Sequence, residues 1–145
     1  MTVVQVTGEI SVSSLIGKLA LRIRNELNTA FQANGFNITS EQWGVLRCLW
    51  QEEGLSQSEI AGKVQKDKAS VTRILDIMEK NRLIIRCDDP SDRRSYRIFL
   101  TAEGKSLESK LKPLAQAANQ QIFQSLDEGE RQELQRLLLK LANRE

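Results

Sequence analysis

Apolar residues in the first part of the chain recur every three to four positions, which is the spacing of one face of an α-helix. This pattern predicts a helix from Ser13 or Ser14 to about Asn34, with Gly35 suited to the left-handed turn that closes it. The apolar stripe of this helix is Leu15, Leu19, Ile23, Leu27, Ala30 and Phe31. Because the stripe exceeds what a small domain can cover, we expect it to contact a second copy of the chain. Residues 1–12 are weakly patterned and are expected to form an arm.

A second helical pattern follows and begins with a capping signal. Thr39 and Gln42 are spaced so that each side chain can bind the free backbone N–H group of the other residue. The predicted helix ends near Gly54, and its buried face is Trp43, Leu46, Leu49 and Trp50. Both tryptophans fit core or hinge packing, with contact to a bound ligand as the alternative interpretation.

The next stretch contains two short helical patterns joined by a tight connection through Gln65 and Lys66. Ser56 and Glu59 have the spacing of a capping box for the first helix, and Asp67 can cap the second. The apolar faces are Leu55, Ile60, Ala61 and Val64 in the first helix and Val71, Ile74, Leu75 and Met78 in the second. The opposite face of the second helix carries Lys68, Ala69, Ser70, Thr72, Arg73 and Asp76. Small and cationic side chains near a helix N-terminus suit a DNA groove, so the pair resembles a helix-turn-helix.

A strand-like composition comes directly after these helices. Leu83–Arg86 and Tyr96–Leu100 are rich in Ile, Leu, Tyr and Phe, and they flank the charged, turn-prone segment DDPSDRRS. The two runs predict a β-hairpin. A helix-turn-helix followed by a basic hairpin is a winged helix, so we expect a mainly α fold with one small hairpin.

The segments VTRILDIMEKNRLI and DDPSDRRSYRIFLTAEG are similar to those of the MarR family of bacterial transcription regulators. The most specific part of the resemblance is DPSDRR at residues 89–94, which runs into LTAEG at residues 100–104. The resemblance covers nearly the whole chain, because the family also has flanking helices that form a dimer. One departure is Arg82, where the family usually has Gly, and we expect the neighbouring Asn81 to supply the left-handed geometry of the turn.

The last third of the chain predicts two more helices. Thr101, with Glu103 in the first turn, can cap a helix that runs to about Ser125. Its apolar stripe is Leu107, Leu111, Leu114, Ala118 and Ile122. Pro113 interrupts this stripe, and because proline removes a helical hydrogen bond, a kink or break is expected near Lys112.

Asp127 and Glu130 cap the final helix, whose aliphatic seam consists of Leu134, Leu137, Leu138 and Leu141. The expected organisation is an arm and dimerisation helix over residues 1–35, a winged helix-turn-helix over residues 36–101 and dimerisation helices over residues 102–145. In the family, the first and the last two helices of both subunits interlock. A monomer that folds its own ends together is the alternative.

Cations are concentrated in the predicted winged helix. The chain has a net charge of +2, but Lys63–Arg97 contains 10 Lys or Arg against 6 Asp or Glu, a net +4 that leaves −2 elsewhere. This distribution favours contact with phosphates over a solvated surface. Cys48 is interpreted as a small core residue and Cys87 as a strand residue, with a redox-sensing role as the alternative.

Several functional classes are disfavoured by what the sequence lacks. No apolar run can span a bilayer, and the first twelve residues do not resemble a signal peptide, so we expect a cytoplasmic protein without membrane contact. The chain has no His, no Gly-rich phosphate loop and no nucleophile that can be paired with a base. We therefore expect neither an enzyme nor a cofactor or metal. A winged helix that binds another protein instead of DNA is the competing hypothesis.

Candidate DNA contacts lie on the second short helix and the hairpin. They are Lys66, Lys68, Ser70, Thr72, Arg73, Asp92, Arg93 and Arg94. Arg73 is expected to reach a base edge or a phosphate, and Lys66 to serve the DNA backbone. The resemblance assigns Arg94 to a narrow minor groove, and we expect Asp92 to orient it through a charge-assisted hydrogen bond. The alternative for that pair is an exposed ion pair of little consequence.

Two copies related by a two-fold axis would read a near-palindromic site in double-stranded DNA. The resemblance points to a homodimeric repressor, with an activator as the alternative that the sequence leaves open. The resemblance further implies release from DNA by a small, often aromatic, effector that binds between the dimer base and the winged helix. The residues available for such a pocket are Leu19, Ile23, Trp43, Leu46 and Leu111. All five are also ordinary core positions, so packing alone is the competing interpretation.

Overall fold

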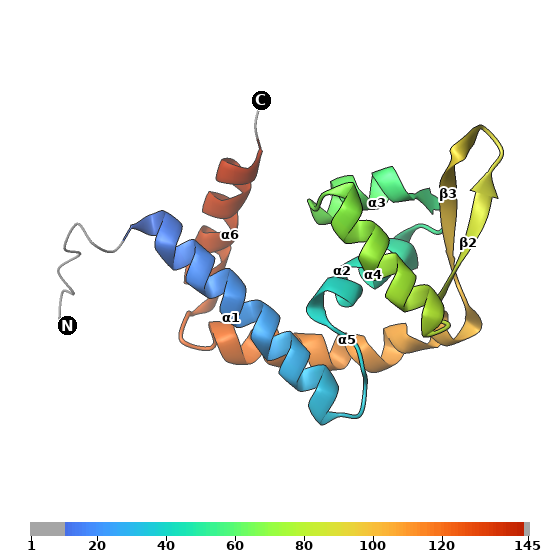
Figure 1. The fold of residues 1–145 in the computed structure, drawn as a ribbon. Coiled ribbons are helices and arrows are strands. Elements are labelled where there is room, and N and C mark those ends of the chain that lie inside the picture. The colour runs from blue at the N-terminus through green and yellow to red at the C-terminus, as the bar shows by residue number, and fades with distance from the viewer. Residues whose placement is uncertain (1–10, 144–145) are drawn as a thin grey trace, which may run out of the picture.

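The computed structural model describes residues 11–143 of the chain. The arm expected over residues 1–12 lies outside the described residues apart from its last two. The elements are, in order, α1 (Val12–Ala33), α2 (Ser40–Gln51), β1 (Leu55–Ser56), α3 (Gln57–Val64), α4 (Lys68–Lys80), β2 (Ile84–Asp89), β3 (Asp92–Leu100), α5 (Ala102–Phe123) and α6 (Glu128–Ala142). α2, α3, α4 and the three strands form a winged lobe, in which the β2–β3 hairpin is the wing, and α1, α5 and α6 form a base (Figure 1). The expected mainly α winged helix is therefore confirmed.

Capping residues place the helix starts where the sequence predicted them. Capping boxes with both hydrogen bonds occur at Thr39, Ser56 and Asp127. Asp67 and Thr101 each accept one hydrogen bond from a backbone N–H group in the first turn of α4 and α5. α1 begins slightly earlier than expected, because Ser11 caps it. These side chains satisfy N–H groups that a helix start leaves unpaired.

One continuous core joins the winged lobe to the base. Its fully covered side chains include Phe31, Leu46, Ile60, Leu75, Met78, Ile98 and Leu111. Trp43 contacts the ring of Phe31, with 5.4 Å between ring centroids, and lies edge-on to Trp50 at 5.5 Å. Trp50 also donates its Nε1–H to the carbonyl of Gly104 at 3.0 Å. The tryptophans therefore pack α1, α2 and α5 together, as the core interpretation expected.

The sheet has three strands in the order β1-β3-β2, all antiparallel. The sequence did not predict β1, a two-residue strand in which Leu55 pairs with Ile98. The hairpin strands are also longer than predicted. Asp88 pairs with Tyr96, and after an irregularity that skips residues 93–95, Asp89 pairs with Asp92. Strand pairing depends on backbone hydrogen bonds, so an exposed ribbon tolerates charged residues that the composition pattern assigns to a loop.

The turn between α4 and β2 survives the missing glycine, but Arg82 itself takes the left-handed conformation with φ +62°. Asn81 has φ −84°, so the expectation that Asn81 would supply this geometry is wrong. The N–H of Leu83 donates to the carbonyl of Met78 at 2.9 Å, and that of Arg82 donates to Glu79 at 3.0 Å. This double hydrogen bond requires the left-handed residue at the position directly after the C-cap, which is Arg82.

Pro113 does not break α5, which runs without interruption from Ala102 to Phe123. Of the kink or break expected near Lys112, the break is therefore wrong. Pro113 and Ser109, whose carbonyl a residue with an N–H would have bound, both lie on the exposed side of the helix. Water can satisfy that carbonyl, so the missing hydrogen bond costs less there than it would in the core.

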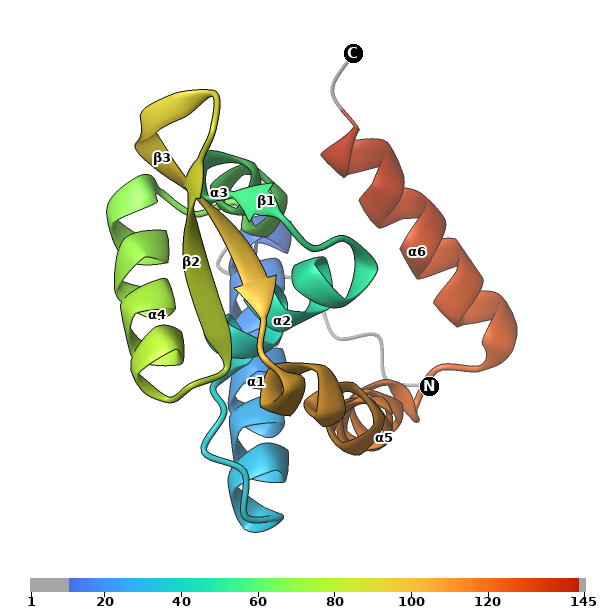
Figure 2. The same cartoon turned by 90° about the vertical axis from the view of Figure 1, so that its right-hand side faces the viewer.

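The base leaves a large apolar surface uncovered. α6 has no buried residue, and in Figure 2 it stands apart from the winged lobe. Its exposed leucines are Leu137, Leu138, Leu139 and Leu141. The first half of α1 adds Val12, Leu15, Ile16 and Leu21, each at least 44% exposed. No helix among residues 11–143 is long and apolar enough to cross a membrane.

Replacing Arg82 with Gly is expected to raise the free energy of unfolding by about 1 kcal/mol, because Gly adopts positive φ without steric strain. Urea unfolding at one fixed protein concentration measures the change. Asn81→Gly is the matched control: its φ is already negative, so it gains nothing from Gly. Equal effects of the two substitutions would contradict the strain at Arg82.

Candidate nucleic-acid interface

The helix-turn-helix presents one face of α4 to solvent. Val71, Ile74, Leu75 and Met78 are buried, as predicted, and a left-handed Gln65 with φ +54° makes the turn from α3. Lys68, Thr72 and Arg73 lie on the exposed side. Burial of the opposite face therefore fixes which side chains of α4 are available to a partner.

Hydrogen bonds hold several of these exposed side chains. Thr72 donates its hydroxyl to the carbonyl of Lys68 at 2.8 Å and accepts a hydrogen bond from Gln57 of α3 at 3.2 Å. Arg73 donates to the hydroxyl of Ser70 at 3.3 Å. Since the Thr72 proton is already committed, Thr72 can offer a partner its methyl group or an acceptor lone pair.

Lys66 lies at the turn and reaches back toward α2. Its Nζ is 3.4 Å from a carboxylate oxygen of Glu41, and both side chains are partly exposed. An exposed ion pair of this kind is weak, so a phosphate can compete with Glu41 for the ammonium group.

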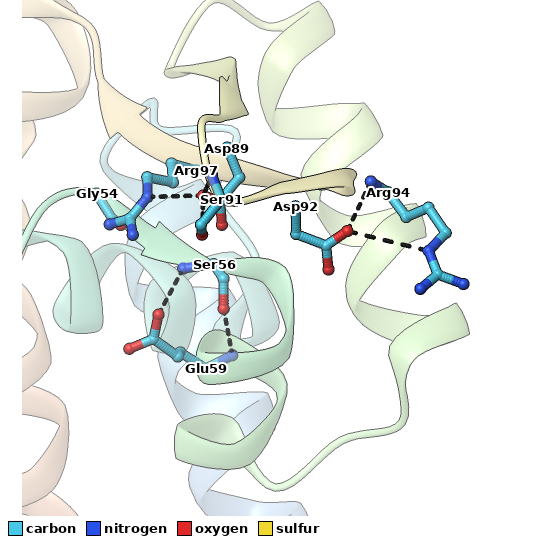
Figure 3. Close-up of polar contacts among 8 residues, drawn as sticks. All are labelled: Gly54, Ser56, Glu59, Asp89, Ser91, Asp92, Arg94 and Arg97. Atoms are coloured by element: carbon cyan, nitrogen blue, oxygen red, sulfur yellow. Dashed lines mark hydrogen bonds and ion pairs between the residues drawn. The ribbon is translucent and has the colours of Figure 1, made fainter.

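Asp92 shapes the tip of the wing through the backbone (Figure 3). Its Oδ1 accepts a hydrogen bond from the backbone N–H of Arg94 at 2.9 Å, whereas the Arg94 Nε is 3.9 Å away. The latter distance is too long for a hydrogen bond, so the expected charge-assisted bond to the guanidinium is wrong. The Arg94 side chain is 94% exposed and projects away from the wing.

A group of residues to which the sequence analysis gave no role braces the wing against the segment before α3 (Figure 3). Asp89 accepts hydrogen bonds from the backbone N–H and the hydroxyl of Ser91, and its carboxylate lies 3.5 Å from Arg97 Nε. Arg97 in turn donates to the carbonyl of Gly54 at 3.1 Å. These hydrogen bonds, those from Ser91 foremost, lower the pKa of the Asp89 carboxyl. The wing is thereby tied to the segment that leads into α3.

Arg86 on β2 is a second residue that sequence reasoning missed. Its guanidinium lies 2.8 Å from Asp76 and 3.2 Å from Glu79, both on α4, and it donates to the carbonyl of Thr72 at 3.3 Å. Asp76, which the sequence pattern placed on the groove-facing side, therefore pairs with the wing instead. The available signal was two acidic residues three positions apart on one helix, followed by a lone Arg in the next strand.

α3, α4 and the wing enclose a hollow of about 640 Å³. It is lined by Gln57, Ser58, Lys68, Thr72, Asp92, Arg94, Ser95 and Tyr96. Lys68 comes from α4 and Arg94 from the wing, so cations from both elements border one concave surface. A concave surface bordered by cations and hydroxyl groups suits a phosphate backbone. Ser70, Arg73 and Arg93 do not line this hollow.

The residues named as candidates for an effector pocket lie at packing positions. Trp43, Leu46 and Leu111 lie in the core, while Leu19 and Ile23 are half-buried on α1.

The two cysteines differ in exposure. Cys48 is half-buried and Cys87 is exposed on β2, and both are free thiols. Burial raises the pKa of the Cys48 thiol, against the opposing charges of Lys63 and Arg47, which disfavours a reactive thiolate.

Comparison with known proteins agrees with this geometry. The MarR family model matches residues 38–96, which span most of the winged lobe. The chain is 36% identical over 110 residues to the uncharacterized HTH-type transcriptional regulator YhbI of Bacillus subtilis, an alignment that covers 74% of this chain and 71% of YhbI.

Solved structures extend the likeness to more than nine-tenths of the chain. MepR of S. aureus, in a structure of its complex with DNA, has a TM-score of 0.81 and 26% identity, with 92% of this chain and 98% of MepR covered. BpsR of Bordetella bronchiseptica, whose DNA binding is described as regulated by 6-hydroxynicotinic acid, has a TM-score of 0.84 and 24% identity. That match covers 93% of this chain and 95% of BpsR, and at this identity it shows the shared fold alone.

Asp89→Ala is expected to destabilise the fold at about pH 7, and its deficit relative to the parent is expected to shrink in acid. The pKa of Asp89 is lowered in the folded state, so its stabilisation is present above the ordinary value of 3.8 and is lost as pH falls through the folded-state value. Urea unfolding of both proteins across this pH range measures the difference. Asp88→Ala, which removes the same charge from the same strand, is the control. A deficit that is constant with pH would contradict the role of the ionised carboxylate.

Proposed function

Because the chain belongs to the MarR family of transcription regulators, we propose that it is a homodimeric repressor that binds a near-palindromic DNA site. Membership of the family makes it a transcription regulator and not an enzyme. The proposed division of labour is a DNA-binding unit over residues 36–101 between dimerisation segments over residues 1–35 and 102–145.

In this proposal α4 enters the major groove and the wing follows the adjacent minor groove. Lys68, Ser70, Thr72 and Arg73 face the bases and phosphates, and Arg94 enters the minor groove, with Arg93 beside it. Asp92 sets the backbone at Arg94, and Lys66 exchanges Glu41 for a phosphate. The observation that carries the proposal is the hollow shared by Lys68 of α4 and Arg94 of the wing, which lets one DNA backbone contact both elements. The structure of MepR with DNA supports the same use of this fold.

The uncovered surface of the base supports dimerisation. Besides the exposed leucines of α6, an apolar groove of about 490 Å³ runs between α5 and α6. It is lined by Asn119, Gln120, Phe123, Arg131, Leu134, Gln135, Leu138, Leu139 and Ala142. An apolar surface of this extent is costly in water and is typical of a subunit interface.

We further propose that a small aromatic effector releases the DNA. The support is the fold shared with BpsR, whose DNA binding is described as regulated by 6-hydroxynicotinic acid. Leu19 and Ile23, half-buried on α1, are the candidates at the edge of the base, and Trp43, Leu46 and Leu111 would have to move out of the core to reach a ligand. Such a molecule acts only if it binds the released arrangement of the two lobes more tightly than the DNA-bound one.

Selection of bound duplexes from a random DNA pool with the purified chain tests the proposed function. The expected result is one enriched sequence with two inverted half-sites about one helical turn apart. Absence of any enrichment would favour the competing hypothesis of a winged helix that binds protein.

Arg94→Ala is expected to weaken binding to the selected duplex about tenfold and to reduce the slope of log affinity against log salt by about one unit, because one phosphate-neutralising cation is lost. Fluorescence anisotropy over a range of salt concentrations measures both effects. Lys110→Ala removes the same charge from α5, away from the wing, and is the control. An unchanged slope in Arg94→Ala would remove the wing from the contact surface.

Leu138→Glu is expected to raise the dissociation constant of the dimer by at least about 100-fold, since it places an unpaired charge in an apolar interface. Sedimentation equilibrium gives the constant for parent and variant. Gln132→Glu adds the same charge to the exposed surface of α6 and serves as the control. A parent chain that sediments as a monomer, or a variant as dimeric as the parent, would contradict the proposed interface.

A further inference from the structure

We infer that Arg86 is a positioning residue that fixes the rotation of α4 relative to the wing, so that selective DNA binding depends on it without its contacting the duplex. The inference rests on the proposed function. Arg86 lies on β2, its side chain is only 14% exposed, and its Nε is buried without a hydrogen-bond partner among the described residues. Burial of the Arg86 guanidinium costs desolvation free energy, and the packing of β2 against α4 does not require a cation at this position.

The partners of Arg86 form a stripe along α4. Thr72, Asp76 and Glu79 are four and three residues apart, so they succeed one another on one side of the helix over two turns. Arg86 bonds the carbonyl of the first and the carboxylates of the other two. Contacts from Arg86 to three positions along α4 oppose rotation of the helix about its own axis, whereas a single contact would allow it.

Rotation of α4 bears directly on base recognition. With side chains extending about 5–6 Å from the helix axis, a rotation of about 20° moves their tips by roughly 2 Å. A hydrogen-bonded contact tolerates only about 0.5 Å of displacement. Thr72 is held from both sides, because Gln57 of α3 donates to its hydroxyl while Arg86 binds its carbonyl. Thr72 thus fixes the position of α4 relative to both α3 and the wing.

Masking of negative charge is the competing role for Arg86, because Asp76 and Glu79 are 58% and 44% exposed near the proposed DNA surface. Asp76→Asn separates the two roles. It turns the shortest contact of Arg86, at 2.8 Å, from a charge-assisted hydrogen bond into a weaker neutral one, and it removes a negative charge. Electrostatics alone then predicts tighter binding of every duplex, whereas positioning predicts a loss that is confined to the selected sequence.

The experiment compares affinity for the selected duplex with affinity for random duplex DNA, at a temperature well below the unfolding midpoint of each protein. Asp76→Asn and Arg86→Gln are both expected to lower this ratio by about tenfold, with Arg86→Lys intermediate because it keeps the charge but loses the planar fork. Lys80→Gln is the charge-matched control on α4 and is expected to leave the ratio unchanged.

An unchanged ratio in Asp76→Asn, whatever the shift in its unfolding midpoint, overturns the inference. The inference is also overturned if Arg86→Gln reduces the slope of log affinity against log salt by about one unit, because Arg86 would then contact phosphate itself. Asp76 is an exposed carboxylate, so its variant keeps the test decisive even where Arg86→Gln fails to fold. A parent chain that prefers no sequence overturns the proposed function as well, whereas a selective parent with equally selective variants overturns this inference alone.

Discussion

The pairing of β3 with strands on both of its edges is the constraint on which the winged lobe depends. One edge pairs with β1, which leads directly into α3, and the other pairs with β2, which follows α4. The helix-turn-helix is therefore held at its entry and its exit by one strand, which also forms one side of the wing. Movement of α4 or of the wing would disturb these backbone hydrogen bonds, so the sheet holds the two elements together. Arg97 and Arg86 reinforce the two edges, one through the carbonyl of Gly54 and the other through α4.

The exit of β3 connects this rigid lobe to the base. Thr101 donates its hydroxyl to the carbonyl of Arg82 at 2.7 Å and caps α5, and the carbonyl of Gly104 accepts from Trp50. A side chain at residue 104 would place its Cβ 2.2 Å from the carbonyl oxygen of Leu83, so only Gly fits there. The arrangement of the base therefore sets where the winged lobe lies. In a dimer, the same geometry would set the separation of the two recognition helices.

The sequence could predict that the helices exist, where they begin and which face of α4 is exposed, because each of these features has a local cause. A capping side chain such as Ser56 or Asp127 acts on an N–H group three residues away, and the apolar period of α4 reflects burial of one face. The predictions were wrong where a neighbour or solvent decided the outcome. Arg82 took the left-handed position because the double hydrogen bond at the end of α4 demands it there, and Pro113 was tolerated because its side of α5 faces water.

The candidate site divides along the same line. Residue types and spacing predicted Lys68 and Arg73 as candidate contacts, because exposed cations on a helix face are visible in the sequence, and the family resemblance pointed to Arg94 in the hairpin. Arg86 joins β2 to α4, Asp89 pairs with Arg97 across the hairpin, and Arg97 reaches Gly54, 43 residues away. β1 is too short for any alternation of apolar and polar residues to be seen. These features depend on the completed sheet, which local patterns do not encode.

A hydroxyl-radical footprint on a duplex carrying the selected site, combined with the mass of the complex, tests most directly whether two winged lobes engage one duplex. Two chains per duplex should protect two patches related by a two-fold axis, with centres about 34 Å apart on one face of the DNA. One chain per duplex, or a single protected patch without symmetry, would contradict the account.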